Sequence, residues 1–410
     1  MCKIECRRGA ASFFRKLALA LLATNLMVAL ASCAALPDRH PPAEAVYESA
    51  QIPGLPDIRI WGDSRPEDMI KWVTRADEIL QELSADAIAA NRPLERNLLA
   101  LSGGAEDGAF GAGLLNGWTE SGQRPEFAMV TGISTGALIA PFAFLGPDYD
   151  DELREVFTTL DKGKVLNLQI LSGLLGGLAF ADTDPFKETI SRYATQEMLD
   201  AIAAEHRKGR GLLIGTTNLD AGRPVIWNIG ALANSGDWRA LRLFRDILLA
   251  SASVPGAFPP VLFEVEAGGE AYDEMHVDGG VGSQVFAYPP SVSLKAIGAN
   301  LGVPVKRTLY VVRNAKLAAS YQAVKPRLGQ IAARSLVVLI KHQGIGDVFR
   351  IYALAQRDNV DFRLAFIPPE FDVELKEPFD QNYMSALYDL GYEIGRSGDF
   401  WLEKPPGVIP

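Results

Sequence analysis

The chain has 410 residues, of which 48% are hydrophobic and 22% charged, a composition typical of globular proteins. Its 40 lysines and arginines against 50 aspartates and glutamates give a net charge of −10, which argues against nucleic acid as a partner. Three cysteines and four histidines exclude a disulfide framework and a zinc-type cluster. No metal or cofactor is therefore expected, and the oligomeric state stays open.

Residues 1–32 are predicted to be a signal peptide. A basic segment precedes an apolar run from Leu17 to Ala31. A helix of that length spans about 22 Å, short of the ~30 Å hydrocarbon core of a bilayer. The order of a basic, an apolar and a small-residue segment is typical of secretory signals rather than of membrane spans.

The signal ends in Leu30-Ala31-Ser32-Cys33, which resembles the bacterial lipobox. That resemblance implies cleavage before Cys33 and acylation of its sulfur, so that buried acyl chains anchor the protein to a membrane surface. Because Ala34 rather than aspartate follows the cysteine, it also implies an outer-membrane lipoprotein facing the periplasm. The alternative is a plain signal peptide cut after Ala31 or Ser32.

The chain after the signal divides by composition. Residues 33–60 contain five prolines and are predicted to be a tether. Residues 61–94 form a helical lead-in, because apolar residues recur at spacings of three and four between Arg65 and Asn91. No break interrupts residues 95–400, which are predicted to form one large domain, and residues 401–410 a C-terminal tail.

Short apolar runs alternate with helical segments in the large domain. The runs predict strands at 97–101, 127–131, 212–216, 225–228, 309–313 and 362–367. The segments between them predict helices at 108–120, 135–144, 184–193, 238–251, 328–355 and 381–395. Near-continuous apolar strands separated by helices indicate an α/β fold with a mainly parallel central sheet flanked by helices on both faces.

The stretch Gly132-Ile133-Ser134-Thr135-Gly136 matches G-x-S-x-G between a predicted strand and a predicted helix. This pattern is typical of a nucleophile elbow, a crowded turn that exposes a serine hydroxyl and needs the small residues Gly132 and Gly136. The start of the following helix places N–H groups near a developing negative charge. Ser134 is therefore the candidate nucleophile.

A glycine-rich stretch from Leu101 to Gly108 also follows a strand and precedes a helix. Its lysine-free sequence excludes a P-loop, and a dinucleotide-binding fingerprint is not clear. With an elbow downstream, the backbone N–H groups of Gly103, Gly104 and Ala105 are predicted to form an oxyanion hole.

A serine nucleophile needs a base. His276 lies two residues before Asp278 on a predicted strand, and His342 lies inside a predicted helix. Asp278 itself precedes the glycine pair Gly279-Gly280, which makes a turn that presents a carboxylate.

The glycine-rich loop, the G-x-S-x-G elbow and the Asp-Gly-Gly turn occur in this order, and together they resemble the patatin-like phospholipase family. The resemblance covers about residues 95–400. It implies a patatin-like fold and a Ser-Asp dyad in which Ser134 is the nucleophile and Asp278 its base. It also implies a lipid acyl hydrolase of the phospholipase A or lysophospholipase type, with a lipid or lysophospholipid substrate.

The sequence departs from this family in its oxyanion loop, G-G-G-x-R-G. Ala105 stands in the third glycine position and Asp107 stands where the arginine is expected. The change removes a cation and adds an anion, which favours neutral or zwitterionic esters over anionic head groups.

Three further interpretations stay open. The first is a non-catalytic lipid-binding lipoprotein on the same fold. The second is an α/β-hydrolase whose Ser-Asp-His triad uses His342. The third concerns the apolar, glycine-rich segment Gly163–Phe180, which is either a flap where acyl chains enter or a buried helix and turn.

Overall fold

A computed structural model describes residues 39–159, 167–168, 181–182 and 184–408. The predicted signal peptide, the lipidation site Cys33 and all but two residues of the segment 163–180 lie outside the described residues. The helices in the described part of the chain are too short or too polar to cross a membrane.

A sheet of nine strands forms the centre of the described structure. Five strands run parallel in the order β11-β10-β2-β3-β6. Beyond β6 the sheet continues with β7, antiparallel to β6, and then β1, antiparallel to β7. The hairpin β8–β9 joins through β9, which also pairs with β6. The strands are β1 (Arg59–Trp61), β2 (Leu94–Leu101), β3 (Met129–Ile133), β6 (Gly211–Asn218), β7 (Arg223–Asn228), β8 (Val261–Ala267), β9 (Glu270–Asp278), β10 (Val305–Arg313) and β11 (Asp361–Phe366), with a separate pair β4 (Asn167–Leu168) and β5 (Ala181–Asp182).

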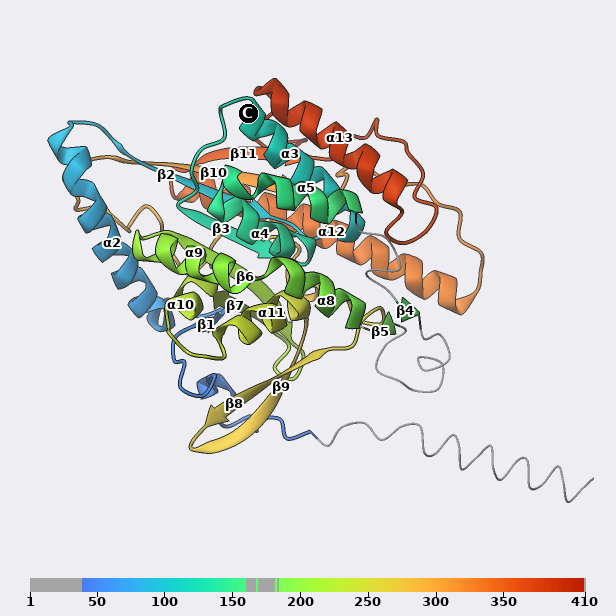
Figure 1. Cartoon of the computed structure of the whole chain (residues 1–410), viewed down its shortest axis with the longest axis horizontal. Helices are drawn as coiled ribbons and strands as arrows, with labels where there is room; N and C mark the ends of the chain where they lie inside the picture. The colour runs from blue at the N-terminus through green and yellow to red at the C-terminus, as the bar shows by residue number, and fades with distance from the viewer. Residues whose placement is uncertain (1–38, 160–166, 169–180, 183, 409–410) are drawn as a thin grey trace, which may run out of the picture.

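Helices cover both faces of the sheet. Figure 1 shows α3, α4, α5 and α13 gathered on one side of the sheet. On the other side, α2 and the C-terminal half of α12 pack in a second apolar cluster. The helices are α2 (Ile70–Ala89), α3 (Gly108–Glu120), α4 (Thr135–Leu145), α5 (Asp150–Thr159), α8 (Asp184–Tyr193), α9 (Gln196–Arg207), α10 (Ile229–Ala233), α11 (Ala240–Ser251), α12 (Leu328–Arg357) and α13 (Gln381–Ser397).

Strand β2 shows why the parallel strands are apolar where both of their faces are covered. Leu98 and Ala100 lie in one apolar cluster, and Leu99 and Leu101 lie in the other. Side chains alternate between the two faces of a strand, so a strand covered on both faces needs an apolar residue at every position. The α/β fold with a mainly parallel sheet is therefore confirmed, although β7, β8 and β9 join the five parallel strands through antiparallel pairings and β1 pairs antiparallel with β7.

The predicted tether over residues 33–60 is wrong for residues 39–60, which pack on the domain. Ile52 and Ile58 are buried, and β1 adds a strand to the sheet edge. Arg39 forms ion pairs with Asp220 and Asp273 at 2.7 and 2.8 Å. The prolines of this segment occur in a stretch that lies against the surface of the large domain. Proline content alone therefore did not identify a free linker.

The predicted tail over residues 401–410 also begins inside the packing. Leu402 pairs with Leu364 of β11, and the Trp401 ring lies 4.9 Å from the rings of Trp118 and Tyr310, centroid to centroid. The large domain therefore includes at least the first residues of this segment.

Helices α3 and α13 approach closely because glycines line their contact. A Cβ on Gly113 or Gly117 would lie 2.0 Å from a carbonyl oxygen of α13, and a Cβ on Gly395 would lie 2.2 Å from one of α3. Backbone atoms occupy the space that a side chain would need, and backbone moves less easily than a side chain. This contact holds α3, the helix that follows the glycine-rich loop.

Gly117→Ala should therefore destabilise the protein by about 1–3 kcal/mol, the usual cost of overpacking a dense interior. Gly346→Ala is the matched control, because this α12 glycine has nothing within 4 Å of an added Cβ. Its stability should stay equal or rise by up to about 1 kcal/mol through helix propensity. Chemical denaturation of both variants measures the difference, and equal stabilities would contradict the close packing of α3 on α13.

Candidate active site

Strand β6 brings Ser134 and Asp278 together. The first half of β6 pairs with β3, where Ile133 lies opposite Gly215. The second half pairs along the same edge with β9, where Asp278 lies opposite the next residue, Thr216. The two strands run toward each other and end head to head, so the residue after β3 and the last residue of β9 become neighbours.

Ser134 adopts the strained conformation of a nucleophile elbow. Its φ of +55° lies in the left-handed region, which is costly for a residue other than glycine. The Ser134 N–H donates to the Ser251 hydroxyl at 3.0 Å, and that hydroxyl donates to the Gly215 carbonyl at 2.7 Å. Ser251, the last residue of α11, therefore ties the strained turn to β6.

The two glycines of the elbow are required by close contacts. A Cβ on Gly132 would lie 2.4 Å from the Gly136 carbonyl oxygen, and a Cβ on Gly136 would lie 2.4 Å from that of Leu101. The other motif glycines are equally confined. An added Cβ would lie 2.1 Å from the Thr135 hydroxyl at Gly108, 2.5 Å from the Gly215 carbonyl at Gly279, and 2.6 Å from the Gln284 amide at Gly280.

Asp278 is a buried carboxylate with one oxygen unsatisfied. Its Oδ1 accepts from the Gly280 N–H at 2.6 Å, and its Oδ2 accepts no hydrogen bond from the described residues. Burial raises the pKa of Asp278 to about 6, and the nearby Ser134 hydroxyl and the Gly280 N–H oppose the shift. The hydroxyl is thus close enough to favour the charged carboxylate, although it does not reach hydrogen-bond geometry with it. A carboxylate of this pKa can accept a proton at neutral pH.

The glycine-rich loop lies beside the nucleophile. A Cβ on Gly103 would be 3.1 Å from the Ser134 Cβ. The Gly103 N–H, predicted to hold an oxyanion, instead donates to the Gln284 carbonyl at 3.0 Å. The N–H groups of Gly104 and Ala105 make no hydrogen bond within the described residues, and Ala105 has a φ of +50°. These two groups are the free donors of the loop.

Arg313, which the sequence analysis did not single out, anchors this loop. It ends β10, is buried, and donates to the Gly103 carbonyl at 2.9 Å and to the Ser102 hydroxyl at 3.0 Å. Asn314 donates through its amide to the Ser102 carbonyl at 2.9 Å. The sequence signal for them was their position: Arg313 is the last residue of the predicted strand 309–313, and Asn314 follows it.

Arg313 also alters the electrostatic surroundings of Asp107. Burial raises the pKa of Asp107 to about 6, while a hydrogen bond from the Tyr383 hydroxyl and the charge of Arg313 oppose the shift. The Tyr383 hydroxyl donates to Asp107 at 2.6 Å. Asp107 is therefore held by α13 and lies near a cation from β10, so the loop still has a positive charge beside it.

The histidines are placed differently from the aspartate. The His276 Nδ1 lies 2.9 Å from the Thr216 hydroxyl and its Nε2 lies 3.1 Å from Glu274, so both ring nitrogens are engaged. Burial lowers the pKa of His276. His342 is exposed on α12. No hydrogen bond joins either histidine to Ser134 among the described residues, and these residues hold no cluster of three potential metal ligands.

Comparison with known proteins gives a family for the central segment. Residues 99–289 match the family model of patatin-like phospholipases. No curated protein matches the chain. Among solved structures, the crystal structure of VipD from Legionella pneumophila is similar at 12% identity and a TM-score of 0.37, covering 75% of this chain and 67% of that one. The matched residues 99–289 contain the glycine-rich loop, the elbow and the Asp-Gly-Gly turn, so the match supports a patatin-like domain over this segment.

Proposed function

We propose that this protein is a lipid acyl hydrolase in which Ser134 and Asp278 act as a catalytic dyad. The observation that carries the proposal is the meeting of a strained serine and a buried carboxylate at the facing ends of β3 and β9. The match to patatin-like phospholipases supports hydrolysis of lipid esters in general.

The dyad performs acyl transfer in two steps. Asp278 takes the proton of the Ser134 hydroxyl as its oxygen attacks the ester carbonyl, and the alcohol leaves with that proton. Water then attacks the acyl-serine and releases the carboxylic acid, with Asp278 again acting as the base. The N–H groups of Gly104 and Ala105 hold the oxyanion of each tetrahedral intermediate.

The substrate class follows from the family and from the loop charge. We propose a phospholipase A or lysophospholipase type of activity on a membrane lipid. Because Arg313 offsets the charge of Asp107, anionic head groups are not disfavoured as strongly as the loop sequence alone suggested.

We further propose that the protein is an exported bacterial lipoprotein held through Cys33 at the outer membrane, facing the periplasm. The basic segment, the short apolar run and the sequence Leu30-Ala31-Ser32-Cys33 support this proposal. An anchor of this kind would keep the enzyme next to its lipid substrate.

Ser134→Ala should abolish hydrolysis of a short-chain carboxylic ester and labelling by a fluorophosphonate probe. The substitution removes one hydroxyl from a turn whose backbone is fixed by other residues, so the melting temperature should change little. Ser235→Ala, at an exposed serine, is the control. Turnover that survives in Ser134→Ala would refute the nucleophile, and an inactive wild type on a broad lipid panel would favour the non-catalytic lipid-binding protein.

Asp278→Asn should lower turnover by about a thousandfold or more, because the serine loses its base. His342→Gln should leave turnover within about twofold, since this histidine is exposed on α12. Steady-state kinetics on the same ester compare the two variants. A loss in His342→Gln as large as that in Asp278→Asn would support the Ser-Asp-His triad instead.

The stability of Asp278→Asn provides a control for folding. The folded pKa of Asp278 is raised to about 6, above its ordinary value. Its contribution to stability is thus present at low pH and lost as pH rises through about 6. At neutral pH the neutral asparagine should therefore be tolerated, and the melting temperature should stay equal or rise. A collapse of the fold would mean that the lost turnover says nothing about the base.

Cys33→Ser should prevent incorporation of a clickable fatty acid into the protein in bacterial cells. Cys2→Ser and Cys6→Ser are matched controls, because both cysteines precede the predicted cleavage site and would leave with the signal peptide. Fluorescence after gel electrophoresis measures the label. Undiminished label in Cys33→Ser would rule out acylation at this cysteine.

A further inference from the structure

A pocket separate from the active site lies at the end of the sheet opposite to Ser134 and Asp278. It has a volume of about 550 Å³ and is lined by residues of α2, of the end of α9 and of the strands β2, β3, β6 and β10. Met129 and Gly211, which begin β3 and β6, line it. Ser134 follows the other end of β3, and neither Ser134 nor Asp278 lines this pocket.

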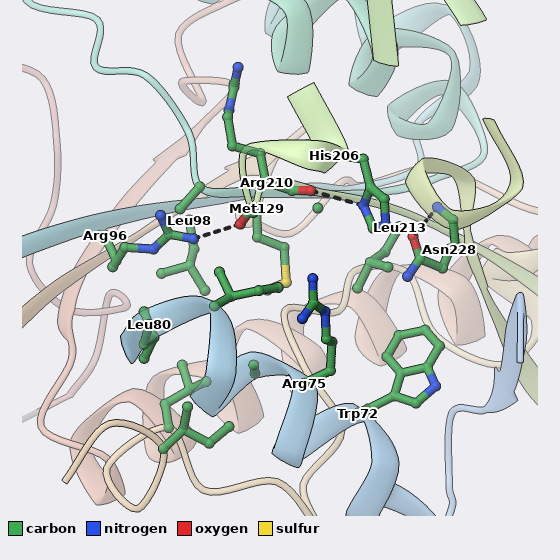
Figure 2. A pocket seen from close by; sticks show the side chains of 18 of the residues that line it. Trp72, Arg75, Leu80, Arg96, Leu98, Met129, His206, Arg210, Leu213 and Asn228 are labelled. Atoms are coloured by element: carbon green, nitrogen blue, oxygen red, sulfur yellow. Dashed lines mark hydrogen bonds between the residues drawn. The ribbon is translucent and has the colours of Figure 1, made fainter. Parts of the chain in front are cut away.

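The pocket is cationic although the chain as a whole is acidic. Six lysines and arginines line it against a single carboxylate, that of Asp57: Lys71, Arg75, Arg96, Arg207, Arg210 and Arg307. Figure 2 shows the Arg210 side chain pointing away, where the guanidinium binds Glu205 and two carbonyls. Asp57 is paired with Lys71 at 3.2 Å, and Arg75 is paired with Glu78 at 3.0 Å. The cations left without an ion pair among the described residues are Arg96, Arg207 and Arg307.

Two of these cations are partly buried without a carboxylate partner. The Arg96 guanidinium donates to the Gly209 carbonyl at 3.0 Å, and that of Arg307 donates to the Ile297 carbonyl at 2.7 Å. Neither has a carboxylate within 4 Å among the described residues. Burial lowers the pKa of Arg96 to about 10, and the charges of Arg210 and Arg307 add to the shift. The carboxylates of Asp358 and Asp77 act on Arg307 only from beyond ion-pair distance. Removing cations from water without a directly paired counter-charge is costly, so an anion placed here is favoured.

The rest of the wall is apolar. Figure 2 shows Trp72 and Arg75 extending from α2 toward the strands, with Leu98, Met129 and Leu213 across from them. A pocket of this size with apolar walls and a few polar groups is typical of small-molecule sites. Hydrated inorganic anions gain nothing from such walls, whereas a hydrocarbon chain gains about 25 cal/mol per Å² of buried surface.

We propose that this pocket binds a small amphiphilic anion, a carboxylate or phosphate head group carried on a short hydrocarbon chain. The Arg96 and Arg307 guanidinium groups bind the head group, with Arg75 at the rim, and the Trp72 side of the pocket holds the chain. The site is separate from the dyad, so the inference does not depend on the proposed hydrolysis.

Titration of the full chain with decanoate and with decyl phosphate, followed by tryptophan fluorescence, tests this inference. Trp72→Phe identifies the part of the signal that comes from the pocket. At least one of the two anions should bind saturably. Decanol should bind at least about tenfold more weakly than that anion, because it lacks the charge. Tighter binding of decanoate would indicate a fatty acid as the natural ligand, and tighter binding of decyl phosphate would indicate a phosphate ester.

Arg96→Gln should weaken anion binding about tenfold or more, the usual effect of losing a hydrogen bond to a charged group. Arg75→Gln, at an exposed position on α2, should weaken it severalfold and tests the site even if Arg96→Gln fails to fold. Arg92→Gln is the matched control, because Arg92 is exposed and does not line the pocket. Wild-type affinity in both pocket variants would overturn the proposal. Decanol that binds as tightly as the two amphiphilic anions would also overturn it, as would inorganic phosphate that binds as tightly as decyl phosphate.

Discussion

The site depends on one strand having two partners along the same edge. Parallel β3 occupies the first half of β6 and antiparallel β9 occupies the second half, so their ends face each other across the Gly215–Thr216 step. Hydrogen bonds of the sheet thereby fix the separation of Ser134 and Asp278. A site placed on strand ends is held more precisely than one placed on free loops.

The surroundings maintain two unfavourable features at this junction. Ser134 has a backbone conformation that favours glycine, and Asp278 is a carboxylate with an unsatisfied oxygen among the described residues. The Ser251 hydroxyl fixes the first, and the Gly280 N–H together with the Asp-Gly-Gly turn positions the second. Strain and burial of this kind lower stability and persist where the rest of the fold holds them in place. Here they give a serine turned toward a buried carboxylate, and a carboxylate whose pKa is raised to about 6.

Local sequence patterns predicted much of this arrangement, and long-range pairing accounts for what they missed. The elbow, the glycine-rich loop and the Asp-Gly-Gly turn could be identified because each lies within a few consecutive residues. The antiparallel approach of β9, the tie from Ser251 and the anchor from Arg313 join segments about 60 to more than 200 residues apart. The hydrophobic periodicity of a segment predicts its own secondary structure and does not indicate which distant segment it contacts. The cationic pocket was invisible for the same reason, since its arginines come from separate elements.

The most direct test of the account is the pH dependence of fluorophosphonate labelling at Ser134, compared between the wild type and Asp278→Asn. A raised carboxyl pKa of about 6 lies close to that of an ordinary histidine, so the wild-type profile alone does not identify the base. The account predicts that wild-type labelling rises with pH through about 6 as Asp278 loses its proton. In Asp278→Asn, labelling should be slow and independent of pH over that range. An unchanged rise near pH 6 in Asp278→Asn would show that another group activates Ser134 and would contradict the dyad.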